Sequence, residues 1–244
     1  MAKPYLSVII PVYNEAKRLP LTLIDIDRHL SEQEYSYEIL VVNDGSKDAT
    51  AEIVERFKPL IENLKLLNNA ENLGKGAAVR DGMQAAKGNW RLFMDADNST
   101  SIIEFNKMIP YLDEGYEVVI GSRAVKGSKF NPAPSLLRRL AGKFGNLIVQ
   151  ATLLRGIWDT QCGFKCFSEE AARRIFSISR LNGWGFDAET LALARKLGYQ
   201  IKEMPIHWVS DSRSHVRFGS YFRVLWDTIR VRWWLWRKSY RIDI

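Results

Sequence analysis

Cysteine is scarce in this chain of 244 residues, which contains only Cys162 and Cys166. Two cysteines in one short stretch cannot build a disulfide framework, and no further cysteine is present to complete a thiolate zinc site. We therefore expect both to be small buried residues of a protein in a reducing compartment.

Long hydrophobic runs are absent as well. A helix that crosses a bilayer needs about 20 predominantly apolar residues, and the stretch 147–154 is short and interrupted by Gln150. The first residues lead directly into the strand-like segment 6–10, without the apolar stretch and cleavage site of a signal peptide. These features predict a cytoplasmic protein.

Internal repeats, low-complexity tracts and Ser/Gly-rich linkers are also missing, so nothing indicates two independent domains. With 46% hydrophobic residues, a chain of this length can bury a full core. Apolar runs of strand length alternate with longer amphipathic stretches, the pattern of strand and helix units around a largely parallel sheet. The predicted strands are 6–12, 39–43, 64–68, 90–94 and 118–120, and the predicted helices are 17–30, 49–61, 77–86 and 102–112.

Asp95 and Asp97 directly follow the apolar run 90–94. In an open α/β sheet, ligands bind outside the carboxyl ends of the strands. Two carboxylates two residues apart can share Mg²⁺ or Mn²⁺, hard cations that take one or two carboxylates and complete their shell with water and substrate phosphates. An isolated Asp-x-Asp is more often a turn or cap, so this interpretation depends on the rest of the chain.

Further polar segments lie next to the predicted strands. Residues 11–15 end the first strand and residues 43–46 end the second, so we expect both to meet the acidic pair at one edge of the sheet. The carboxylate of Asp44 can accept a nucleobase hydrogen, although the segment also fits a simple turn. Residues 72–76 precede a helix, and their glycines and lysine could approach phosphate oxygens at its N-terminus.

These motifs, in their order along the chain, resemble the inverting family 2 glycosyltransferases. The resemblance extends over roughly residues 5–217 and rests on the segments 7–15, 41–46, 72–76, 95–97, 121–123, 159–165 and 184–189. The last two segments are similar to those of dolichyl-phosphate and polyprenyl-phosphate glucosyltransferases. The resemblance implies the GT-A fold over residues 1–217: an α/β domain with a Rossmann-like nucleotide-sugar-binding sheet and helices on both faces.

The resemblance also implies roles for individual residues. Pro11, Tyr13, Glu15 and Asp44 are expected to line the nucleoside pocket of the donor, and Asp95 and Asp97 to contact the metal and the donor diphosphate. Gly74 and Lys75 join the donor-binding residues through their place before a helix N-terminus. Some relatives supply another metal ligand as Gln two positions after the second Asp. Here that position is Ser99, so the third ligand stays open. Asp159 and Gln161 resemble the acceptor-side loop, and Asp187 opens a helix over it.

The acceptor decides which further groups the chemistry needs. A hydroxyl acceptor needs a general base, whereas a phosphomonoester is already largely a dianion at neutral pH and needs cations to position it. Arg123 is the preferred ligand for an acceptor phosphate because a guanidinium binds phosphate bidentately. Arg138 and Arg139 are further candidates, with a solvated helix face as an equal alternative. We interpret Asp187 as a helix cap or as a group that orients the acceptor, in preference to a general base.

The C-terminal segment 218–244 is basic and rich in tryptophan. From Arg213 onward the chain has eight Lys or Arg against two Asp, and it holds four of the eight tryptophans. Helical spacing gives an apolar stripe of Phe218, Phe222, Leu225, Ile229, Trp233 and Trp236, opposite a face of Arg223, Asp227, Arg230, Trp234, Arg237 and Arg241. Such a helix is typical of the interface of an anionic membrane. The alternative is a helix that packs its apolar stripe onto the protein's own core.

Together, these observations predict a metal-dependent enzyme that transfers a hexose with inversion to a polyprenyl or dolichyl phosphate, at the cytoplasmic face of a membrane. UDP-glucose is the favoured donor on the resemblance alone. Two alternatives stay open. One is a family 2 transferase that acts on a glycan or glycolipid hydroxyl, with Asp187 or Glu189 as base. The other is an inactive relative that binds lipid or nucleic acid. The presence of both Asp95 and Asp97 argues against the second, and we expect no nucleic-acid partner.

Overall fold

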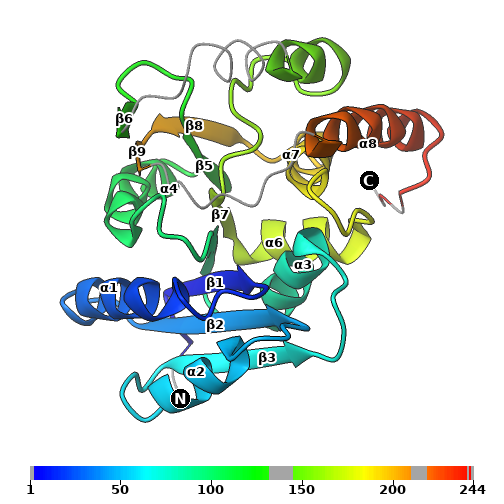
Figure 1. The fold of residues 1–244 in the computed structure, drawn as a ribbon. Coiled ribbons are helices and arrows are strands. Elements are labelled where there is room, and N and C mark those ends of the chain that lie inside the picture. Colours follow the sequence, from blue (N-terminus) through cyan, green and yellow to red (C-terminus); the bar gives the residue numbers. More distant parts are fainter. Residues whose placement is uncertain (1–2, 132–144, 210–218, 241, 243–244) are drawn as a thin grey trace.

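The computed structural model of the protein describes residues 3–131, 145–209, 219–240 and 242. In this part of the chain, seven strands form one sheet in the order β3-β2-β1-β4-β7-β5-β8 (Figure 1). β7 runs antiparallel to both of its neighbours, and all other pairs are parallel. The strands are β1 (Leu6–Val12), β2 (Tyr37–Asp44), β3 (Leu64–Asn69), β4 (Trp90–Met94), β5 (Val118–Ser122), β7 (Phe164–Ser168) and β8 (Ile201–Pro205). All five predicted strands are therefore present, and β7 and β8 are additional.

Helices cover both faces of the sheet, so the fold has three layers. Val8 and Ile10 of β1 pack into the cluster on one face, and Ile9 packs into the cluster on the other. Burial on both faces explains why the strands are continuous apolar runs and do not alternate with polar residues. The first face is covered by α1 (Leu19–Ser31), α2 (Thr50–Phe57), the 3₁₀ helix η1 (Ile102–Lys107) and α4 (Ile109–Asp113); the second by α3 (Lys75–Ala85), α6 (Glu169–Ile178) and α7 (Phe186–Lys196).

The predicted helix 102–112 is divided into η1 and α4. Pro110 lies in the first turn of α4, where its missing amide hydrogen costs nothing, whereas inside a longer helix its ring would clash with the preceding turn. The hydroxyl of Ser101 accepts a hydrogen bond from the Ile103 amide at 3.4 Å, but Glu104 pairs with Lys107. Ser101 is therefore the N-cap of η1, without the reciprocal hydrogen bond from a glutamate that would complete a capping box.

A second, two-stranded sheet lies beside the main one. It pairs β6 (Lys129–Asn131) with β9 (His207–Val209), and the Phe130 and Trp208 rings meet edge to face at 6.2 Å. Both cysteines are free and buried, as predicted, and burial raises the pKa of Cys162 to about 12.

The C-terminal helix α8 (Gly219–Trp236) packs beside α7 (Figure 1). Val231, together with Tyr240 after the helix, is buried in the same cluster as α3, α6 and α7. The helix therefore packs through Val231 and leaves Ile229, Trp233 and Trp236 of the predicted apolar stripe exposed. Phe218, the side chain of Phe222 and Arg241 lie outside the described residues. Within the described ranges, no helix has both the length and the apolar composition needed to cross a bilayer.

Candidate active site

The polar motifs lie at one edge of the sheet. The parallel strands β1, β2, β4 and β5 end there, and the antiparallel β7 begins there, because Met94 at the end of β4 lies opposite Phe164 at the start of β7. The loop before β7 therefore meets the residues after β4, and the Asp95 amide donates a hydrogen bond to the Gly163 carbonyl at 3.2 Å. Segments from five strands thus contribute to one candidate site, as expected for ligand binding at strand ends.

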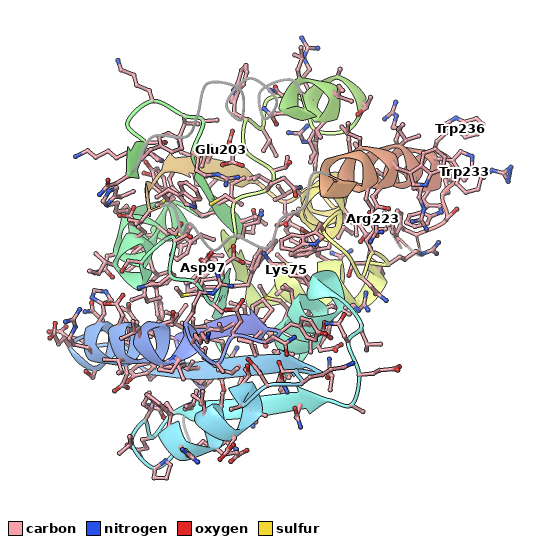
Figure 2. All side chains as sticks on the ribbon, in the orientation of Figure 1. Lys75, Asp97, Glu203, Arg223, Trp233 and Trp236 are labelled. Carbon is pink, nitrogen blue, oxygen red and sulfur yellow. The ribbon has the colours of Figure 1, made fainter. Side chains whose placement is uncertain are left out.

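Asp95 is held between Lys75 and Gly163. Its Oδ1 lies 2.5 Å from the Nζ of Lys75, whose ammonium also lies 4.9 Å from the ring centre of Trp184. A Cβ at position 163 would come within 2.0 Å of Asp95 Oδ2, so a side chain there would displace the carboxylate. Burial favours the neutral amine of Lys75, but the charges of Asp95 and Asp187 outweigh it and raise the pKa of Lys75. Figure 2 shows Lys75 and Asp97 near the middle of the molecule.

Asp95 and Asp97 fit a hard divalent cation as a pair. Their side chains are 35% and 23% exposed. Asp97 Oδ1 accepts a hydrogen bond from the Ser99 amide at 3.0 Å, and Nη1 of Arg18 lies 4.0 Å from its Oδ2. Among the described residues, no group of three or more His, Cys, Asp or Glu could hold a metal. Mg²⁺ or Mn²⁺ would therefore take two carboxylates from the described protein and its other oxygens from water and a diphosphate, a mode these ions commonly use.

Asp44 orders the loop that leads into α3. It is buried, and its two oxygens accept hydrogen bonds from the amides of Leu73 at 2.9 Å and Gly74 at 2.8 Å. Gly74 has φ 105°, and a Cβ there would meet the Asn182 carbonyl oxygen at 2.5 Å, so glycine is required. Lone pairs remain on the Asp44 carboxylate for a nucleobase, and that contact stays a prediction.

Three other predicted donor residues follow β1 or lie in it. Pro11 is half-buried in the strand, and the Tyr13 ring is exposed beyond its end. Glu15 is paired through both oxygens with the Arg18 guanidinium, with Nε at 2.6 Å. Tyr13 therefore offers an exposed ring for stacking on a base, whereas Glu15 is already engaged.

Arg123, after β5, is fixed in a two-pronged pair with Asp159. The Nε–Oδ2 distance is 2.7 Å, the Nη2–Oδ1 distance is 2.9 Å, and the Arg123 amide adds a bond of 2.9 Å to Oδ2. Burial opposes both charges, but each partner outweighs it, so the pKa of Arg123 is raised and that of Asp159 is lowered. The guanidinium also lies 5.7 Å from the ring centre of Trp208. Asp159 is thus the residue that orients Arg123.

Glu203 supports this pair, although no role was predicted for it. Its carboxylate accepts hydrogen bonds from the amides of Trp158 at 2.8 Å and Asp159 at 3.0 Å. The sequence indicates little here, because Glu203 is a single acid in the short strand β8 and belongs to no recognisable motif. Gln161 lies in the same loop, and its Nε2 is buried without a hydrogen-bond partner among the described residues, so this donor is available to a ligand.

Lys165 is a second residue for which no role was predicted. It is fully buried in β7, forms a close ion pair with the buried Asp187 and donates a hydrogen bond to the Cys162 carbonyl at 2.6 Å. Asp187 lies in the first turn of α7, but the N-cap is Gly185 and no side chain caps the helix. The interpretation of Asp187 as a cap is therefore wrong, because its carboxylate is used by Lys165.

Glu189 is a structural residue in this arrangement. It is fully buried and accepts hydrogen bonds from the amides of Arg180 and Leu181, both at 2.8 Å, and from the Tyr240 hydroxyl at 2.7 Å. A carboxylate with three donors and no exposed surface is not placed to take a proton from a substrate. The predicted phosphate ligands Arg138 and Arg139 lie outside the described residues.

Comparison with known proteins adds sequence relatives over most of the chain. A family model described as glycosyl transferase family 2 matches residues 7–176. The chain is 38% identical over 241 residues to the dolichyl-phosphate beta-glucosyltransferase of Dictyostelium discoideum, covering 93% of this chain and 74% of that protein. It is 32% identical over 241 residues to the Homo sapiens protein of the same name, with the same two coverages.

Solved structures share the fold. Glucosyl-3-phosphoglycerate synthase from Mycobacterium tuberculosis, in complex with Mn²⁺, UDP-glucose and phosphoglyceric acid, matches with a TM-score of 0.70 at 18% identity, over 94% of this chain and 79% of that one. Mannosyl-3-phosphoglycerate synthase from Rubrobacter xylanophilus matches with a TM-score of 0.69 at 17% identity, over 97% and 75%. The mixed sheet with helices on both faces is the GT-A fold that the motifs predict.

Proposed function

The chain belongs to glycosyl transferase family 2, and on this basis we propose that it transfers glucose from UDP-glucose, with inversion, to the phosphate of a dolichyl or polyprenyl phosphate. The relatives named dolichyl-phosphate beta-glucosyltransferase, at 32–38% identity, support this choice of donor sugar and acceptor. The synthase from Mycobacterium tuberculosis was crystallised with UDP-glucose, which supports the choice of nucleotide.

The observation that carries the proposal is the placement of charge at the sheet edge. Arg123 is held by Asp159 with its planar fork fixed, on the same edge as Asp95 and Asp97. An acceptor phosphate already carries its nucleophilic oxygen in ionised form, so a cation that orients it replaces a general base. The two carboxylates suggested as bases for a hydroxyl acceptor are engaged otherwise, Asp187 by Lys165 and Glu189 by three donors. A phosphate acceptor therefore fits the described residues better than a hydroxyl.

On the donor side, Asp95 and Asp97 would hold Mg²⁺ or Mn²⁺. When bound, the ion supplies Lewis-acid stabilisation of the charge that gathers on the leaving diphosphate. Lys75 fixes Asp95 by the 2.5 Å contact and adds a cation close to where a diphosphate would lie. Tyr13 offers its exposed ring to the base, and Asp44 holds the loop 72–76 against the donor.

The proposed donor can be tested with a panel of radiolabelled nucleotide sugars. We expect label from UDP-glucose to enter the organic extract when the protein is incubated with a polyprenyl phosphate, and little from GDP-mannose or UDP-N-acetylglucosamine. Preferential transfer of another sugar would contradict the proposed donor while leaving the family assignment intact.

Arg123 is expected to act on the acceptor and not on the donor. Arg123→Lys keeps the charge but loses Nη1, the guanidinium nitrogen that Asp159 does not engage, so the KM for polyprenyl phosphate should rise about tenfold or more, the loss of one charge-assisted hydrogen bond. The affinity for UDP-glucose, measured by calorimetry, should stay unchanged. Lys126→Ala, which removes an exposed cation three residues later, is the matched control. Equal losses of donor affinity and acceptor use would assign Arg123 to the donor site.

The acceptor is a membrane lipid, and we propose that the protein reaches it peripherally, at the cytoplasmic face, through α8. The exposed Trp233 and Trp236 support this role, because tryptophan favours the membrane interface. Co-sedimentation with vesicles should weaken in Trp233→Ser/Trp236→Ser relative to Leu60→Ser, which changes an exposed leucine elsewhere on the surface. Equal sedimentation of the two variants would contradict the role of α8.

A further inference from the structure

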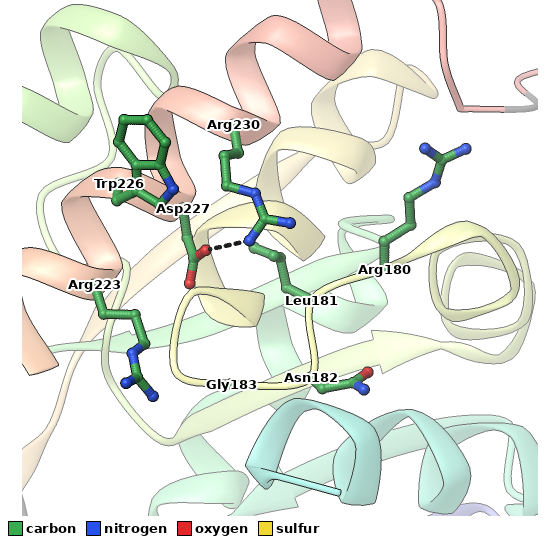
Figure 3. A pocket seen from close by; sticks show the side chains of 8 residues that line it. All are labelled: Arg180, Leu181, Asn182, Gly183, Arg223, Trp226, Asp227 and Arg230. Atoms are coloured by element: carbon green, nitrogen blue, oxygen red, sulfur yellow. Dashed lines mark hydrogen bonds and ion pairs between the residues drawn. The ribbon is translucent and has the colours of Figure 1, made fainter.

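An open pocket of about 480 Å³ lies between α8 and the loop that precedes α7 (Figure 3). Residues 180–183 line it from the loop, and Arg223, Trp226, Asp227 and Arg230 line it from α8. Figure 3 shows Arg223 and Arg230 extending from the helix toward the loop. No side chain of this lining is assigned to the donor or the acceptor above, although the Asn182 carbonyl lies against the donor loop and accepts a hydrogen bond from the Gly76 amide at 2.7 Å.

We propose that this pocket binds the phosphate of an anionic membrane phospholipid, with Arg223 and Arg230 as its ligands. The proposal rests on the membrane-surface part of the proposed function and adds a defined lipid site to it. The site holds a head group, and its two arginine ligands take no part in the chemistry proposed at the sheet edge.

The charges of the pocket favour an anion. Arg180, Arg223 and Arg230 line it against one acid, Asp227, which is buried. Asp227 Oδ1 lies 3.0 Å from Arg230 Nη1 and holds that guanidinium in place. Two positive charges are therefore left without a carboxylate in the pocket lining.

The three arginine side chains differ in how many partners they already have. Arg180 donates to the Ser239 carbonyl and lies 5.1 Å from the ring centre of Tyr240, so it is fixed by the C-terminal segment. Arg223 is exposed and has no hydrogen-bond or ion-pair partner among the described residues. Its fork is thus available for a bidentate contact with phosphate oxygens, the geometry that guanidinium favours.

The surroundings of the pocket indicate that the phosphate belongs to a lipid. Trp226, Ile229, Trp233 and Trp236 are 62%, 51%, 49% and 76% exposed, and their spacing of three and four residues places them on one face of α8. Figure 2 shows Trp233 and Trp236 pointing away from the body of the protein. Arg223 and Arg230, seven residues apart, form the adjacent stripe. Trp226 belongs to both features, because it lies in the exposed stripe and lines the pocket.

This arrangement places the pocket at the head-group level of a membrane. If the tryptophans lie in the interface, the arginines beside them reach the phosphate layer, where each basic side chain near an anionic surface contributes about 1 kcal/mol. A pocket between two arginines and a loop can contribute more, because charge-assisted hydrogen bonds add to the general attraction. A defined phosphate site and a general attraction to the membrane surface therefore predict different effects on vesicle binding. Only the defined site makes an arginine that lines the pocket more important than another exposed arginine of α8.

The matched control is Arg232, which is exposed on the same helix but does not line the pocket. The full-length protein is mixed with vesicles of phosphatidylcholine and phosphatidylglycerol in equal parts, and the partition coefficient is measured by co-sedimentation. Arg223→Gln is expected to lower it about tenfold or more, and Arg232→Gln about fivefold or less. Arg223→Lys keeps the charge and loses the planar guanidinium, so its partition coefficient should be lower than that of the unchanged protein. Equal partition of Arg223→Gln and Arg232→Gln would overturn the pocket and leave general attraction only.

A soluble competitor separates the lipid from other sources of phosphate. Glycerol phosphate at constant ionic strength should displace the unchanged protein from vesicles only weakly, because it lacks the bilayer contacts of the tryptophans. If the protein binds glycerol phosphate at the pocket but does not bind vesicles, a free phosphate compound is the ligand and the lipid proposal is wrong. Transfer of glucose to a short, water-soluble isoprenyl phosphate should be the same in Arg223→Gln and the unchanged protein. If neither Arg223→Gln nor the unchanged protein transfers glucose to this acceptor, the proposed function is contradicted and the pocket is not.

Discussion

Asp97→Asn is expected to lower turnover about 10²–10³-fold, the usual cost of removing one group that stabilises charge in a transition state. Asparagine keeps the size of the side chain. Its amide oxygen can still accept the hydrogen bond that the Ser99 amide donates to Asp97 Oδ1 at 3.0 Å. The loop should therefore keep its shape while the site loses one of its two metal-binding carboxylates. Turnover is measured with UDP-glucose and polyprenyl phosphate at saturating Mg²⁺ or Mn²⁺.

Two comparisons make this result specific. Asp113→Asn changes an exposed aspartate at the end of α4 and should leave both turnover and melting temperature unchanged. Treatment of the unchanged protein with EDTA should reproduce the loss, and added Mn²⁺ should restore activity. If Asp97→Asn or the EDTA-treated protein turns over like the untreated one, the acidic pair does not hold a metal.

Lys165→Met is expected to destabilise the protein by about 3–5 kcal/mol, because it leaves the carboxylate of Asp187 buried without its partner. Lys165 is fully buried and Asp187 is nearly so, and water cannot replace the lost charge. For a protein of this size, each kcal/mol corresponds to roughly 2–4 °C in melting temperature. The loss should therefore be plain in a thermal melt.

A second variant distinguishes the ion pair from a simple packing defect. Lys165→Met/Asp187→Leu removes both charges, so it should be more stable than Lys165→Met alone, since replacing a whole buried pair is often close to neutral. Lys202→Met in β8 is the control: that lysine lies 4.9 Å from the ring centre of Tyr111, and its change should cost much less. A double variant as unstable as the sum of its single changes would contradict the ion-pair interpretation.

Much of the sheet could be predicted because its strands are buried on both faces. The runs 6–12 and 90–94 agree with β1 and β4 at both ends. Apolar runs bounded by polar turns mark such strands clearly. β7 was not predicted, because its five residues include the charged Lys165, which is acceptable in the core only through its pairing with Asp187 of α7. That pairing is a tertiary contact, and local patterns do not reveal it.

The candidate site was predictable for the residues that end parallel strands. Asp44, Asp95 and Arg123 all lie just at or after strand ends, where the edge rule places ligands. The rule does not apply to β7, whose antiparallel direction brings residues 159–163 to the site from the start of a strand. Glu203 was missed for a similar reason, because it acts through backbone amides of a distant loop.

The C-terminal helix shows the limit of an amphipathic pattern. The structure has a helix over Gly219–Trp236, but a helical pattern cannot say which face meets the protein. α8 packs through Val231, with Thr228 and Asp227 also buried, and it exposes Trp226, Trp233 and Trp236. The alternative in which the apolar stripe packs onto the core is therefore wrong for Ile229, Trp233 and Trp236, because α8 meets the core through a different face.

The most direct test of the central claim compares two acceptors that differ only in the phosphate. The purified protein is incubated with UDP-glucose, Mg²⁺ and either a polyprenyl phosphate or the free polyprenol of the same chain length, and the glucose in the organic extract is measured. We expect a β-linked glucosyl phosphate product from the polyprenyl phosphate and none from the alcohol, because the described site offers cations for a phosphate and no free base for a hydroxyl. Equal transfer to the free polyprenol would contradict the account.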